Sequence, residues 1–85
     1  MKNYNSLGKF NCSGTRIRRR RKELKLSQEQ LAAKLQLAGL DITQKAISRM
    51  ETGLRVVPDY EIPFLADALG VSILWLLGRE AENNK

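Results

Sequence analysis

The sequence predicts an all-α fold, a compact five-helix domain. Apolar residues recur with the spacing of one helix face along most of the chain. Most of these segments follow a Ser or Thr that can cap a helix, and most end near a glycine. No segment alternates apolar and polar residues between turn signals, so no sheet is expected. With 85 residues, 42% of them hydrophobic, the chain forms at most one domain with a modest core.

The first helix is expected over about 15–26. Thr15 can cap it, and Ile17 and Leu24 lie seven positions apart on one face. The polar stretch 1–13 before this helix has no sustained period and contains residues that favour turns. We therefore expect a flexible N-terminal arm there.

The second helix is expected over about 28–38. Ser27 can cap it, and Gln30 three positions later completes the capping-box pattern. Gly39 is a natural stop.

The third helix, expected over 44–52, lies in the stretch ITQKAISRMETG between the cap Thr43 and the stop Gly53. Drawn as a helix, this stretch has an apolar face made of Ala46, Ile47 and Met50. The opposite face consists of Gln44, Lys45, Ser48 and Arg49. Such a row of hydrogen-bonding side chains differs from the mixture of Glu and Lys on an ordinary solvated face.

A fourth helix is expected from about Asp59–Glu61 onward, with a distorted first turn because Pro63 lacks an N–H group. The fifth is the short segment ILWLLG, which begins after the cap Ser72 and ends at Gly78. The polar residues 80–85 then suggest a frayed tail.

Basic residues are concentrated in the first two thirds of the chain. The net charge is +6, from 15 Lys and Arg against 9 Asp and Glu. Residues 1–56 carry 13 bases and 4 acids, whereas residues 57–85 carry 2 bases and 5 acids. One strongly positive end is typical of a partner of a polyanion. The arginine run 18–21 has two other readings, a solvated helix face and a membrane-surface helix, the latter weakened by its narrow apolar side.

Several functions are disfavoured by what the chain lacks. It has no His, which excludes His-based acid–base catalysis and most zinc sites, and its lone Cys12 rules out an internal disulfide. No signal peptide is visible, and the longest apolar run, 73–77, is too short to span a membrane. We expect a cytoplasmic protein that is not an enzyme and binds no metal or cofactor. No aromatic residue is interleaved with the basic stretch, which disfavours single-stranded RNA binding.

Two capped helices in succession, with a glycine between them, point to nucleic acid. Gln28 and Gln44 each follow a cap, where unpaired N–H groups and the helix dipole attract phosphate oxygens. A major groove admits one α-helix, in which Gln can pair twice with adenine and Arg twice with guanine. We therefore expect DNA base contacts from Gln44, Lys45, Ser48 and Arg49.

Three stretches resemble the Cro/C1-type helix-turn-helix family, also called the XRE family of phage and bacterial repressors. They are RIRRRRKELKLSQEQLAAKL, ITQKAISRMETG and LADALGVSILWLLG, in this order. The resemblance covers about residues 15–78 and implies a lambda-repressor-like DNA-binding domain at 14–79. Its helix-turn-helix would be formed by the second and third helices. The connection QLAGLDIT is longer than the family's usual turn, which implies either a longer second helix or a loop.

The resemblance also implies roles for individual residues. Together with the basic run and the helix caps, it leads us to expect DNA phosphate contacts from Arg18, Arg19, Gln28, Thr43, Thr52 and Arg55. It implies a partly buried ion pair between Arg21 and Glu51. The surplus apolar surface of the last helix and the family's tendency to dimerise imply a homodimer with three interface candidates, Ile73, Leu74 and Leu77.

The function expected from these features is regulation of transcription. The protein would bind double-stranded DNA at a palindromic operator as a homodimer and act as a repressor. The alternative is an antitoxin or operon accessory protein whose main role is to bind a partner protein. A nuclease is disfavoured because paired acids at metal spacing and a phosphate-cradling loop are both missing from the sequence.

Overall fold

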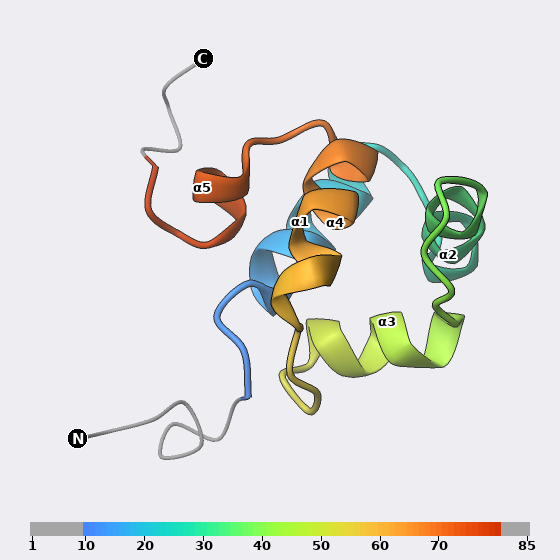
Figure 1. The fold of residues 1–85 in the computed structure, drawn as a ribbon, viewed down its shortest axis with the longest axis horizontal. Coiled ribbons are helices and arrows are strands. Elements are labelled where there is room, and N and C mark those ends of the chain that lie inside the picture. The colour runs from blue at the N-terminus through green and yellow to red at the C-terminus, as the bar shows by residue number, and fades with distance from the viewer. Residues whose placement is uncertain (1–9, 81–85) are drawn as a thin grey trace.

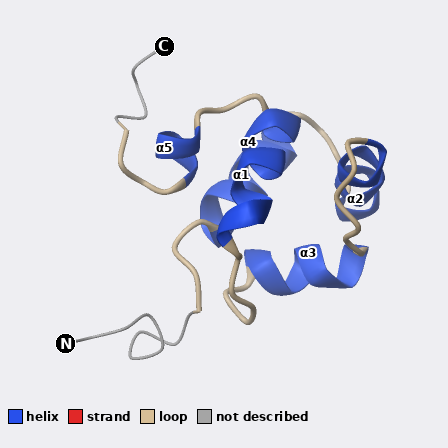
Figure 2. Ribbon diagram, in the orientation of Figure 1, coloured by secondary structure: helices blue, strands red, loops and turns tan. Residues whose placement is uncertain are grey.

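Helices make up all the regular secondary structure of residues 10–80, the part of the chain that this computed structural model describes (Figures 1 and 2). Most of the expected arm and tail, residues 1–9 and 81–85, lies outside the described residues. The elements are α1 (Gly14–Glu23), α2 (Gln28–Leu37), α3 (Gln44–Glu51), the short 3-10 helix η2 (Asp59–Glu61), α4 (Ile62–Leu69) and α5 (Ile73–Leu76). The predicted all-α, five-helix class is confirmed.

Side-chain caps begin three of the helices where the sequence predicts them. The hydroxyls of Ser27, Thr43 and Ser72 each accept the backbone N–H of the residue three positions on. At α2 the cap is reciprocal, because the side chain of Gln30 accepts the backbone N–H of Ser27 at 2.8 Å. These caps fix the N-termini of α2 and α3, the two helices of greatest functional interest.

All five α-helices end in the same hydrogen-bonded turn. A residue with positive φ follows each helix, and the next residue donates its N–H to the carbonyl five positions earlier. Glycine occupies the positive-φ position after four helices, but Lys25, with φ 60°, occupies it after α1. α1 therefore ends at Glu23, earlier than the expected residue 26, and its cap position is Ser13 rather than Thr15.

One hydrophobic core joins the five helices. Figure 1 shows α1 and α4 crossing at the centre of the molecule, with α2, α3 and α5 around them. The largest fully buried side chains come from every α-helix: Ile17, Leu31, Leu35, Ile47, Met50, Leu65, Leu69 and Leu76. Pro63 lies in the first turn of α4, where its missing N–H is tolerated, and η2 supplies the expected distorted start.

The long connection between α2 and α3 is a loop and not an extension of α2. Leu40 and Ile42 are buried in the core, and the side chain of Gln36 donates to the carbonyl of Ile42 at 2.6 Å. The loop residues between α2 and α3 are therefore held in place by the buried side chains of Leu40 and Ile42. They cover the core and leave the outer face of α3 exposed.

The last residues of the expected arm are packed against the domain. Ser13 is buried, Asn11 is only 8% exposed, and the backbone N–H of Phe10 donates to the carbonyl of Gly53 at 2.9 Å. Residues 10–13, which the sequence assigns to the arm, are therefore in contact with the helical domain that is expected to begin at residue 14.

Candidate nucleic-acid interface

The outer face of α3 is polar and accessible. Gln44, Lys45 and Arg49 are exposed, and Ser48 is half-buried. No hydrogen bond or ion pair joins the side chains of Lys45 and Arg49 to the rest of residues 10–80. Their cationic groups are therefore available to an external ligand, while Ile47 and Met50 fill the core behind them.

A continuous chain of hydrogen bonds runs from the interior to the N-terminus of α3. Arg21 donates from Nε to Oε2 of Glu51 at 2.6 Å and from Nη2 to Oε1 at 3.0 Å. Gln28 then donates from Nε2 to Oε1 of Glu51 at 3.1 Å. Finally, Gln44 donates from Nε2 to Oε1 of Gln28 at 2.6 Å. The Arg21–Glu51 pair implied by the resemblance is thus formed, and it continues to the expected base-reading residue.

The carboxylate of Glu51 fixes the direction of every bond in this chain. An ionised carboxylate can only accept, so Gln28 must turn its amino group toward Glu51 and its oxygen toward Gln44. The hydrogen bonds from Arg21 to Glu51 raise the pKa of the Arg21 guanidinium, against the smaller opposing effect of burial. Because one N–H of Gln44 is used on Gln28, its Oε1 and its second N–H remain for an external ligand, one as an acceptor and one as a donor.

The two threonines that flank α3 differ in what they can offer a phosphate. The hydroxyl of Thr43 accepts the N–H of Ala46 at 3.1 Å, so its own hydrogen remains able to donate. The hydroxyl of Thr52 instead donates to the carbonyls of Ser48 and Arg49, at 3.1 and 3.3 Å. Only Thr43 therefore has a donor directed away from the helix backbone.

Comparison with known protein families agrees with this arrangement. A family model described as helix-turn-helix matches residues 17–76, which include the whole of α2 and α3. The chain belongs to the Cro/C1-type helix-turn-helix family. It is accordingly a DNA-binding transcription regulator, with a lambda-repressor-like fold.

The two phosphate-contact candidates on α1 lie on different sides of this helix-turn-helix domain. The guanidinium carbon of Arg19 lies 5.2 Å from the centre of the Trp75 ring, and that of Arg16 lies 6.0 Å from it. This stacking holds Arg19 on the side of α1 that faces α5. Arg18 is exposed and lies about 60° around the helix from Arg21, the residue that contacts α3. Arg18 therefore lies nearer than Arg19 to the side of α1 that contacts α3.

Arg55 has an internal partner that the sequence did not reveal. Its Nη1 and Nη2 donate to the two carboxylate oxygens of Glu61 at 2.8 and 2.9 Å, and Nη1 also donates to the carbonyl of Val56 at 3.0 Å. Glu61 is only 3% exposed, and its hydrogen bonds are the main reason that the pKa of Arg55 is raised. The charge of Arg55 is thus compensated within the domain by Glu61.

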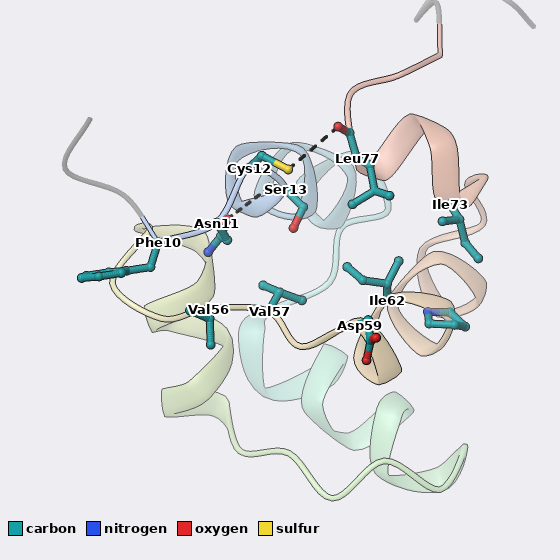
Figure 3. A pocket seen from close by; sticks show the side chains of 11 residues that line it. Phe10, Asn11, Cys12, Ser13, Val56, Val57, Asp59, Ile62, Ile73 and Leu77 are labelled. Atoms are coloured by element: carbon teal, nitrogen blue, oxygen red, sulfur yellow. Dashed lines mark hydrogen bonds between the residues drawn. The ribbon is translucent and has the colours of Figure 1, made fainter. Parts of the chain in front are cut away.

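An apolar surface lies around α5. Ile73 and Leu74 are 42% and 57% exposed, whereas Leu76 enters the core and Leu77 is half-buried. Ile73 and Leu77 line a hollow of about 390 Å³ together with Phe10, and Figure 3 shows these side chains around it. Two of the interface candidates, Ile73 and Leu77, therefore line this hollow, and the third, Leu74, is exposed next to Ile73 in the chain.

Metal and membrane sites are not found in the part of the chain that the structure describes. Residues 10–80 contain no group of three or more side chains able to hold a metal ion. None of their helices has the length and hydropathy needed to cross a membrane.

Proposed function

We propose that the protein is a transcriptional repressor that reads the major groove of double-stranded DNA with α3. The single observation that carries this proposal is the outward face of α3. On this face Lys45 and Arg49 have no partner among residues 10–80, and Gln44 is oriented by Gln28. Binding would repress transcription sterically, by covering a promoter.

The orientation of Gln44 predicts which base it reads. Adenine presents a donor at N6 and an acceptor at N7 in the major groove. The outward Oε1 of Gln44 would accept from N6, and its remaining N–H would donate to N7. Lys45 and Arg49 carry donors only, which suit the two acceptors of guanine. Ser48, half-buried between them, is the fourth expected base contact.

Phosphate contacts would come from groups around the two helix N-termini. Gln28 uses one N–H on Glu51 and retains a second, and Thr43 retains its hydroxyl hydrogen. Arg18 adds an exposed cation from α1. Each phosphate neutralised by a cation contributes about −0.9 to the slope of log affinity against log salt, so this slope counts the ionic contacts.

A homodimer on a palindromic operator completes the proposal. The exposed apolar side chains Ile73 and Leu74, with Leu77 beside them, would pack against a second copy of the chain. Two recognition helices would then meet half-sites about one helical turn of DNA apart. Leu74→Glu should yield monomers in sedimentation experiments and leave the helical circular dichroism unchanged.

Selection of binding sites from a random duplex pool tests the function directly. We expect enrichment of a palindromic sequence, and Gln44→Ala should lose an adenine preference of about 1–3 kcal/mol at one position of each half-site. Arg49→Ala should weaken binding, whereas Arg79→Ala, which removes an exposed arginine beyond α5, is the matched control that should not. If no duplex sequence is enriched, the proposal fails and a partner protein becomes the better explanation.

A further inference from the structure

Asn11 uses its full hydrogen-bonding capacity inside the domain. Its Nδ2 donates to the carbonyls of Met50 and Arg55, at 3.0 and 2.7 Å. Its Oδ1 accepts the backbone N–H groups of Ser13 and Gly14, at 3.1 and 2.7 Å. A side-chain amide has two donor hydrogens and two acceptor lone pairs, so all four are paired. Asn11 thus connects the start of α1 to the end of α3.

The backbone approaches closely at the same place. A Cβ atom added to Gly14 would lie 2.2 Å from the carbonyl oxygen of Met50, so only glycine fits. The N–H of Phe10 donates to the carbonyl of Gly53, just beyond α3. We call residues 10–14 the N-terminal clamp. The N-terminal clamp contacts the C-terminal end of α3 through Met50 and Gly53, and Arg21 of α1 contacts the same end through Glu51.

We propose that Asn11 is a positioning residue for DNA recognition, which sets the direction in which α3 presents Gln44 without itself contacting DNA. This inference rests on the proposed function, because it concerns the accuracy with which α3 meets a base edge. The carbonyls of Met50 and Arg55 lie at and beyond the C-terminal end of α3, and Gln44 lies at the opposite end.

The length of α3 converts a small rotation at the clamp into a large displacement of Gln44. An eight-residue helix is about 12 Å long, so a tilt of about 10° at one end moves the other end by about 2 Å. Hydrogen bonds to a base edge weaken within a few tenths of an ångström and a few tens of degrees. Contacts of flexible cations with phosphates tolerate such movement. Loss of the clamp should therefore reduce base discrimination before it reduces non-specific binding.

Asn11→Asp tests this separation. The carboxylate can still accept the N–H groups of Ser13 and Gly14, which preserves the start of α1, but it cannot donate to the carbonyls of Met50 and Arg55. The ratio of affinities for the selected operator and for a single-base variant at the adenine position would be measured with the full chain. We expect this ratio to fall at least about fivefold, against the factor of about 5 to 150 that a bidentate base contact supplies. Affinity for random duplex and its salt slope should stay at wild-type values.

A destabilised control separates positioning from folding. Gly70→Ala strains a residue with φ 68° at the end of α4, away from α3, and should leave the discrimination ratio unchanged. Trp75 fluorescence and circular dichroism would show that each variant is folded at the assay temperature. If Asn11→Asp does not fold, Asn11→Ser would be measured instead. Its hydroxyl can donate to only one carbonyl, so its discrimination ratio should lie between the wild-type value and the value expected when neither carbonyl has a donor.

The possible outcomes are distinct. A folded Asn11→Asp variant with the wild-type ratio would overturn the inference. Loss of random-duplex and operator binding in equal proportion would also overturn it, because that pattern indicates a structural role alone. If the wild-type chain discriminates between no duplexes, the proposed function fails and the inference fails with it.

Discussion

Replacing Arg21 with Met should remove much of the stability of this domain, and replacing Glu51 with Leu as well should recover much of the loss. Arg21 and Glu51 form a two-pronged ion pair whose side chains are only 9% and 2% exposed. The single substitution leaves the carboxylate of Glu51 buried without its cation. Gln28 then remains as its side-chain donor, which compensates only part of the charge.

The expected magnitudes follow from burial and from the number of bonds lost. Breaking a buried pair by removing one partner costs about 3–5 kcal/mol. An 85-residue domain has a total stability of about 4–13 kcal/mol, so this loss is a large fraction of it. In the double variant no charge remains buried at this site. The residual cost comes from the carbonyl of Leu26, which loses the Nη1 of Arg21, and from Gln28, at about 1 kcal/mol each.

Urea unfolding followed by Trp75 fluorescence would supply the four free energies of this double-mutant cycle. We expect a coupling of at least about 2 kcal/mol for the buried pair. The exposed pair Arg20–Glu23 is the matched control and should show less than about 1 kcal/mol. If the two single losses for Arg21 and Glu51 simply add in the double variant, the reasoning about the buried charge is refuted.

Three further predictions concern charged side chains. Lys25→Gly should stabilise the domain by about 1 kcal/mol in urea unfolding, because glycine adopts a φ of 60° without strain; a loss would contradict this. Arg55→Met should destabilise the domain by about 3 kcal/mol, because it leaves the buried carboxylate of Glu61 without its cation. The slope of log affinity for DNA against log salt should not change. If its magnitude falls by about 0.9, Arg55 does contact a phosphate. The pKa of both Arg21 and Arg55 is raised, so their pairs contribute stability below the ordinary arginine pKa and lose it only as pH rises through the higher folded value. Urea midpoints should therefore show no loss from these pairs between about pH 6 and 9.

The features predicted correctly from the sequence depend on a few neighbouring residues. A cap needs only one hydroxyl and the helix that follows it, and Ser27, Thr43 and Ser72 all occupy the predicted positions. The end of α1 was predicted too late because Lys25 gives no local signal for positive φ. The C-terminal turn there is formed without the glycine that usually marks it.

The missed features depend on contacts between residues far apart in the chain. In sequence, Arg19 and Arg55 look like available cations, yet one stacks on Trp75 and the other pairs with buried Glu61. The sequence places Asn11 in a polar arm, but in the structure its amide donates to the carbonyl of Met50, 39 positions later. No local periodicity reports such contacts, so the internal partners of these two arginines cannot be read from the sequence.

Stability and base preference are coupled through Glu51, and the double variant Arg21→Met with Glu51→Leu should separate them. Without the carboxylate, Gln28 can present either its oxygen or its amino group to Gln44. In the reversed arrangement Gln44 directs two donors outward, which suit the O6 and N7 acceptors of guanine rather than the edge of adenine.

This reversal has a predictable size. If the two orientations of the Gln28 and Gln44 amides are equally occupied, the affinity for adenine falls only by a factor of about two, or about 0.4 kcal/mol. The second orientation also allows Gln44 to bind guanine, which the wild-type orientation does not. Competition between operators that differ by adenine or guanine at this position should therefore show a sharply reduced preference in a variant that has recovered much of the stability lost by Arg21→Met alone. If adenine preference persists undiminished, the orientation of Gln44 is set by the DNA itself, and the bond chain from Arg21 serves stability alone.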